Sequence, residues 1–162
     1  MCWDCDHPAS RMEDHLTTLR RCIDARGWAV QAIERDRAHP PWAYTVGLSP
    51  RGLPELVVTG MAPLEAGRLL DDAAEHFAHR CLPSPGQRFA LAGGPLLEVV
   101  AVARPWAHLL VAARLFGERI SALQLVHSDL EGRWPWDREY SGVVGGQPVL
   151  GVRARPPSRG GG

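Results

Sequence analysis

Apolar positions recur at helical spacing in three parts of the chain. The first stretch, 11–26, follows Ser10 and Glu13, a Ser-x-x-Glu pair typical of a helix N-terminal capping box. A second apolar stripe begins at Pro63 and continues to about residue 81. A third, shorter helix is expected over 106–116, before a glycine. The pattern therefore predicts two main helices and one short helix.

The remaining apolar positions alternate with polar ones, as in half-buried strands. Such runs cover 28–36, 39–49, 53–60, 87–93, 95–103 and 120–129. Ser49-Pro-Arg-Gly52 separates two of these runs and predicts the turn of a hairpin. Hairpins without regular strand–helix alternation indicate an α+β fold with a mostly antiparallel sheet. We expect five or more strands, with both main helices on the same face.

The length of 162 residues and an apolar content of 45% suit one soluble domain with its own core. We expect an N-terminal cysteine-containing arm at 1–9, a single domain at 10–152, and a disordered Arg/Pro/Gly-rich tail at 153–162. Apolar runs are too short to cross a membrane, and no secretory signal precedes the first helix. Four cysteines are too few for a disulfide scaffold, so the predicted location is the cytoplasm.

Charge excludes some functions. Acidic and basic residues balance at 18 each, so there is no net field to attract nucleic acid or an anionic membrane. Every basic residue is arginine, which excludes a phosphate-loop lysine and a lysine Schiff base.

Four sequence blocks carry a resemblance to a known family. They are MCWDCDHP, PPWAYTVGLSPRGLPELVVTG, LLEVVAVARPWAH and LQLVHSDLEGRWPWD. Together they resemble the bacterial family called domain of unknown function 4262, from about Cys2 to Leu150. The resemblance implies a shared fold, and because it implies no activity, function must be argued from residues.

The leading functional prediction is a cysteine-based site at the N-terminus. Cys2, Cys5 and His7 are suitable ligands for zinc or another transition metal, and His15 lies within reach as a fourth. The flanking aspartates oppose thiolate formation, which disfavours a thioredoxin-like role but leaves other thiol chemistry open. A packed or weakly ordered arm is the alternative. Cys22 is expected to be a small core residue, as is the cysteine at position 81.

The predicted hairpin offers a second candidate. Ala43, Thr45 and Gly47 share one face of their strand, where small residues leave room for a flat ligand or for close packing of the second helix. Helix packing is the preferred interpretation. Thr45 and Glu55 are the candidate polar groups, although exposure at a sheet edge is the ordinary explanation for Glu55.

A third candidate lies near the end of the domain. His127, Asp129 and Asp137 could serve in acid–base chemistry, but no nucleophile motif accompanies them. Trp134 and Trp136 flank one proline, so both indoles should face the same side, either capping the core or stacking on a ligand.

Two further functional classes therefore remain open beside the cysteine site. One is a non-enzymatic binding module for a peptide or small molecule. The other is a flavin-binding split barrel. Whether the protein is an enzyme is left open.

Overall fold

The computed structural model describes residues 8–142 and 145–155. The predicted Cys2, Cys5 and His7 ligands and most of the predicted tail lie outside these residues. The helices are α1 (Pro8–Arg26), α2 (Pro63–His79), α3 (Pro105–His108) and α4 (Leu110–Phe116), with a 3-10 turn at Ser49–Arg51. The strands are β1 (Ala29–Ile33), β2 (Trp42–Val46), β3 (Glu55–Thr59), β4 (Arg88–Ala90), β5 (Leu96–Ala101) and β6 (Ala122–His127).

The six strands form one sheet in the order β1-β2-β3-β6-β5-β4. All neighbours are antiparallel except β3 and β6, which are parallel and pair Glu55 with Ala122 and Val57 with Gln124. A parallel pair needs a long connection between its two strands, and here α2, β4 and β5 lie between β3 and β6 in the chain. The α+β prediction with a mostly antiparallel sheet is therefore confirmed.

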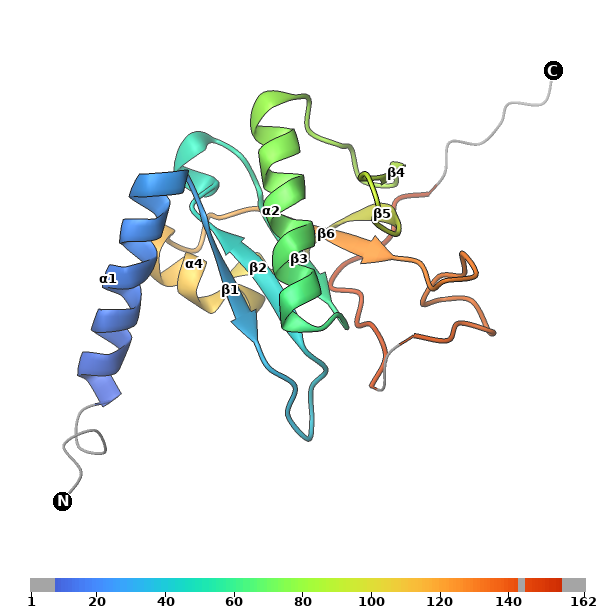
Figure 1. Cartoon of the computed structure of the whole chain (residues 1–162), viewed down its shortest axis with the longest axis horizontal. Coiled ribbons are helices and arrows are strands. Elements are labelled where there is room, and N and C mark those ends of the chain that lie inside the picture. The colour runs from blue at the N-terminus through green and yellow to red at the C-terminus, as the bar shows by residue number, and fades with distance from the viewer. Residues whose placement is uncertain (1–7, 143–144, 156–162) are drawn as a thin grey trace.

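Helix α2 covers one face of the sheet (Figure 1). Its apolar stripe includes Leu70, Ala73 and Phe77, all buried. These side chains pack against strand residues such as Ala43 of β2 and Leu125 of β6. The small-residue face of β2 thus admits a helix closely, as the preferred sequence interpretation expected.

The opposite face is covered by helices over one half only. Tyr44 and Val57 pack with Leu109 and Ala112 of the α3–α4 region. Ile23 of α1 joins this same cluster, and α1 runs beside β1 at the sheet edge (Figure 1). The expectation that α1 and α2 cover the same face is therefore wrong, because the turn at Gly27 places α1 on the α4 side.

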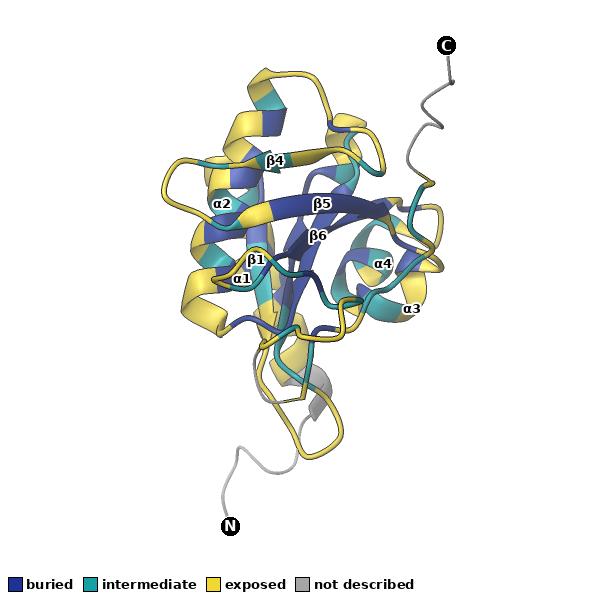
Figure 2. Cartoon of the chain, turned by 90° about the vertical axis from the view of Figure 1, so that its right-hand side faces the viewer, coloured by how far each residue is buried: buried dark blue, intermediate teal, exposed yellow. Residues whose placement is uncertain are grey.

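The C-terminal segment after β6 covers the other half of this face. Val100 of β5 and Val126 of β6 pack with Trp134, and Val149 and Trp136 lie against them. Figure 2 shows the largely buried strands β5 and β6 between α2 on one side and α3 and α4 on the other. The α3–α4 region and the C-terminal segment therefore meet beside β2 and β3.

Two sequence expectations are corrected by the local backbone. The predicted helix over 106–116 is broken at Leu109, whose φ of −97° and ψ of 65° separate α3 from α4. The described strands form an open sheet with edges at β1 and β4, so a split barrel was the wrong architecture. In the part of the chain that the structure describes, no helix combines the length and apolar character needed to cross a membrane.

Candidate functional site

The predicted cysteine site is represented in the described residues by His15 alone. Its side chain is exposed, and its Nε2 lies 2.6 Å from Oε1 of Gln31 on β1. Cys22 is half-buried and Cys81 is exposed, so the prediction of a core position is wrong for Cys81, which lies just beyond α2. Within residues 8–142 and 145–155, no three His, Cys, Asp or Glu side chains are grouped to hold a metal ion.

Glu55 is fully buried at the start of β3, a central strand, so the expected edge exposure was wrong. Its carboxylate accepts hydrogen bonds from the Thr45 hydroxyl at 2.7 Å, from the Gly47 N–H at 3.1 Å, and from both the N–H and hydroxyl of Ser49. The Thr45 hydroxyl in turn accepts from the Leu56 N–H. Glu55 and Thr45 therefore hold the β2–β3 connection in shape.

Gly47 adds a close backbone approach to this hairpin. Its φ is 126°, and a Cβ there would lie 3.0 Å from the carbonyl oxygen of Gly27 and from Cα of Trp28. The space left by the small residues is consequently filled at this end by the α1–β1 junction. No room for a flat ligand remains beside Gly47.

His127 is buried at the end of β6. Its Nε2–H donates to the carbonyl oxygen of Thr59 at 3.1 Å. Burial lowers the pKa of His127, although hydrogen bonds to the backbones of Thr59 and Ser128 oppose the shift. The imidazole is thus neutral at neutral pH and is occupied in joining β6 to the end of β3.

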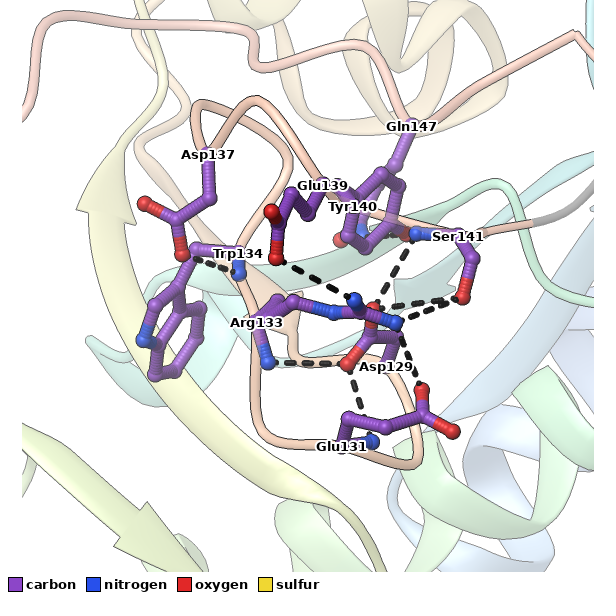
Figure 3. A network of polar contacts seen from close by, with 9 residues as sticks. All are labelled: Asp129, Glu131, Arg133, Trp134, Asp137, Glu139, Tyr140, Ser141 and Gln147. Atoms are coloured by element: carbon purple, nitrogen blue, oxygen red, sulfur yellow. Dashed lines mark hydrogen bonds and ion pairs between the residues drawn. The ribbon is translucent and has the colours of Figure 1, made fainter.

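Asp129 organises the loop that follows β6 (Figure 3). One carboxylate oxygen accepts from the N–H groups of Glu131 and Arg133, and the other accepts from Arg133 Nε at 2.9 Å and the Ser141 N–H. Desolvation raises the pKa of Asp129, but these hydrogen bonds outweigh it and lower the pKa to about 2. Asp137 accepts from the Trp134 N–H in the same loop. The predicted acid–base residues are therefore not brought together.

Trp134 and Trp136 stack on each other, so both indoles lie on the same side of the chain. Their ring centroids lie 5.4 Å apart with an interplanar angle of 5°. Arg88 lies over the Trp134 ring, with its Cζ 4.6 Å from the centroid, and Arg153 lies over Trp136 at 3.5 Å. Both guanidinium groups also bond the buried carboxylate of Glu98. Arg88 and Arg153 therefore cover the two indoles, which cap the core.

A cavity lies where the α3–α4 region meets the C-terminal segment on this face of the sheet. Its volume is about 440 Å³, within the range that ligand pockets have. The apolar lining comes from four separate segments: Ile33, Pro40, Trp42, Ala107, Leu110, Pro148 and Leu150. Ile33 is 36% exposed and Leu110 is 63% exposed, so apolar surface continues from the cavity to solvent. We call this feature the Trp42 cavity.

A few polar groups lie around this apolar lining. They are Glu34, Asp36, His39, Thr59 and His108. The Asp36 carboxylate accepts from the N–H groups of Ala38 and His39, which lowers the pKa of Asp36 and keeps it charged. The His108 ring meets the Trp42 indole edge-on, with centroids 6.2 Å apart. Among the residues that the structure describes, no arginine lines the cavity.

None of the six predicted ligand-binding residues lines the Trp42 cavity. Sequence reasoning missed its actual lining because the cavity depends on the break at Leu109, which places both His108 and Leu110 at its wall. One signal was present in the sequence. Leu110 lies on the exposed side of a short helix, where a large apolar side chain is unusual.

Comparisons with known proteins give one match. The model of the family described as a domain of unknown function (DUF4262) matches residues 22–141, which include all six strands and α2, α3 and α4. No curated protein and no solved structure matches the chain. Since the match extends over most of the sequence and confirms the resemblance, this chain belongs to the DUF4262 family.

Proposed function

We propose that the protein is a binding module that holds a small apolar molecule in the Trp42 cavity. The observation that carries this proposal is an apolar cavity of about 440 Å³ with a few polar groups at its border, which is the usual composition of a small-molecule site. Trp42 supplies a large flat surface, since its indole is half-buried at the start of β2. An aromatic or aliphatic group fits this lining best.

The charges around the Trp42 cavity favour a neutral or cationic ligand over an anionic one. Glu34 and the charged Asp36 contribute negative charge, and arginine is absent from the part of the lining that the structure describes. Arg35 and Arg37 alternate with these carboxylates along the same loop but are not among the lining residues, so Glu34 and Asp36 are the acidic side chains that face the cavity border. The face of an indole also attracts cations, so Trp42 adds to the same preference.

Calorimetric titration with three indole compounds tests this proposal. Tryptamine, indole and indole-3-acetate share the same ring and differ in charge. We expect tryptamine to bind with a dissociation constant on the order of 0.1–1 mM, as is reasonable for a ligand of this size. Indole should bind more weakly, and the carboxylate should bind about tenfold more weakly than the amine, because Glu34 and Asp36 repel it.

Two matched variants locate the binding. Leu110→Arg places a charged side chain at the cavity border and should abolish tryptamine binding. Leu130→Arg introduces the same group at a fully exposed leucine outside the lining and should leave binding unchanged. Failure of all three indoles to bind, or equal loss in the two variants, would contradict the proposal.

The N-terminal cysteine site remains a separate proposal, supported by the Cys2, Cys5 and His7 spacing alone. If it binds zinc or another transition metal, untagged protein should contain about one equivalent of metal, and Cys2→Ser with Cys5→Ser should lose it. The double variant should melt cooperatively like the parent, because the sheet and the apolar faces of α2 and α4 supply most of the core. Metal analysis that finds equal metal in both proteins would reject the proposal.

A further inference from the structure

Residues 146–153, which we call the strap, run across the β3–β6–β5 half of the sheet. Two of them, Pro148 and Leu150, line the Trp42 cavity. The strap is thus one wall of that cavity, while β2, the loop before it and α3–α4 form the others. The strap also lies beyond residue 141, where the family match ends.

The strap is attached largely by side-chain amides. Gln124 of β6 donates from Nε2 to the Pro148 carbonyl at 2.7 Å and accepts at Oε1 from the Leu150 N–H at 2.7 Å. Gln147 of the strap makes the reciprocal pair with β6, accepting from the His127 N–H and donating to the His127 carbonyl. The Leu150 carbonyl accepts from the Ala103 N–H at 2.8 Å.

Two glycines allow this close approach. A Cβ at Gly60 would lie 2.7 Å from the Gly146 carbonyl oxygen, and one at Gly151 would collide with the Ala101 carbonyl. Both positions therefore require glycine for the strap to lie against the sheet. The strap position is specified by the sequence and is not an incidental contact of a tail.

The far end of the strap is fastened by one side chain. Arg153 binds Glu98 at 2.9 Å through Nε and at 3.1 Å through Nη2, and it covers the Trp136 ring. Between the fastened ends, Pro148 and Val152 are exposed and only Val149 and Leu150 reach apolar clusters. A segment held by few apolar contacts opens at a lower free energy than the core does.

We infer that the strap is a movable wall whose docking is coupled to occupancy of the Trp42 cavity. This inference rests on the proposed function. A ligand that contacts Pro148 and Leu150 gains those contacts only while the strap is docked. Binding of the ligand must therefore favour the docked state. By reciprocity, any change that loosens the strap lowers the affinity of the cavity for the ligand. Arg153, at the far end of the strap, acts as a positioning residue for the cavity.

Amide hydrogen exchange measured by NMR tests the coupling. The N–H groups of Leu150 and Ala103 report strap docking, because their hydrogen bonds break when it lifts. Arg153→Ala should accelerate exchange at both by about tenfold, reflecting one lost ion pair and one lost cation–π contact. Arg155→Ala removes the same charge two residues further on and should have no effect. The Gly27 amide, bonded to Ile23, should be unchanged in both variants.

Tryptamine supplies the second arm of the experiment. At about ten times its dissociation constant it should slow exchange at Leu150 and Ala103 by about tenfold in the parent protein, and not at Gly27. If tryptamine shifts the Trp42 indole resonance but leaves exchange at Leu150 and Ala103 unaltered, the coupling is wrong while the proposed function stands. If the Trp42 resonance does not respond, both are wrong. Equal exchange in Arg153→Ala and Arg155→Ala would refute the role of Arg153.

Discussion

Glu55→Ala is expected to lower the free energy of unfolding by about 3–5 kcal/mol, because it leaves several buried or half-buried donors without an acceptor. The donors are the Gly47 and Ser49 N–H groups and the hydroxyls of Thr45 and Ser49. The Thr45 hydroxyl loses the acceptor of its proton, while its oxygen still accepts from the Leu56 N–H. Denaturant unfolding followed by circular dichroism measures the change.

Two further variants define the origin of this effect. Glu55→Gln retains one acceptor oxygen in the same place and should lose about half as much stability, near 2 kcal/mol. Glu118→Ala removes an exposed glutamate and should change stability by less than about 0.5 kcal/mol. If Glu55→Ala were as mild as Glu118→Ala, the hydrogen-bond hub at the β2–β3 connection would be disproved.

Trp134→Ala is expected to cost about 3–5 kcal/mol of stability, which is typical for truncating a buried aromatic residue. Trp134 is only 5% exposed and packs against Val100 and Val126, so its removal opens a hole in the core cluster on that face. It also removes the ring over which Arg88 lies. Calorimetric melting should show a clearly lower transition temperature.

Matched substitutions separate a core cap from a ligand platform. Trp136 is half-buried, so Trp136→Ala should cost less, about 1–2 kcal/mol. Trp106 is 42% exposed and lies outside the stack, so Trp106→Ala should cost less still. Unchanged melting of both Trp134→Ala and Trp136→Ala would overturn the core-cap assignment and favour the ligand platform.

Local signals in the sequence predict most of the secondary structure. Turn residues at 49–52 and periodic apolar positions in α2 are read directly, because they depend on neighbours in the chain. The parallel pairing of β3 with β6 and the side of the sheet that α1 occupies depend on contacts distant in sequence. Periodicity indicates that a helix has an apolar face, but it does not say which face of the sheet receives it.

The polar candidates illustrate the same limit at the level of sites. Glu55, His127 and Asp129 have the residue types of catalytic groups, yet each is occupied by backbone or loop partners. A carboxylate that organises a turn and one that awaits a substrate are alike in sequence. The Trp42 cavity was missed for the opposite reason, since its lining is assembled from segments that carry no common motif.

The central claim is that the Trp42 cavity binds a small apolar, preferably cationic, molecule. Titration of the isotopically labelled protein with tryptamine, followed through the Trp42 indole N–H and the His108 ring resonances, tests it most directly. We expect these two signals to move together and to saturate, while the Trp28 indole, bonded to Asp71 on the α2 side, stays fixed. Saturable shifts at Trp28 or at the Trp134–Trp136 stack without any at Trp42 and His108 would contradict the account.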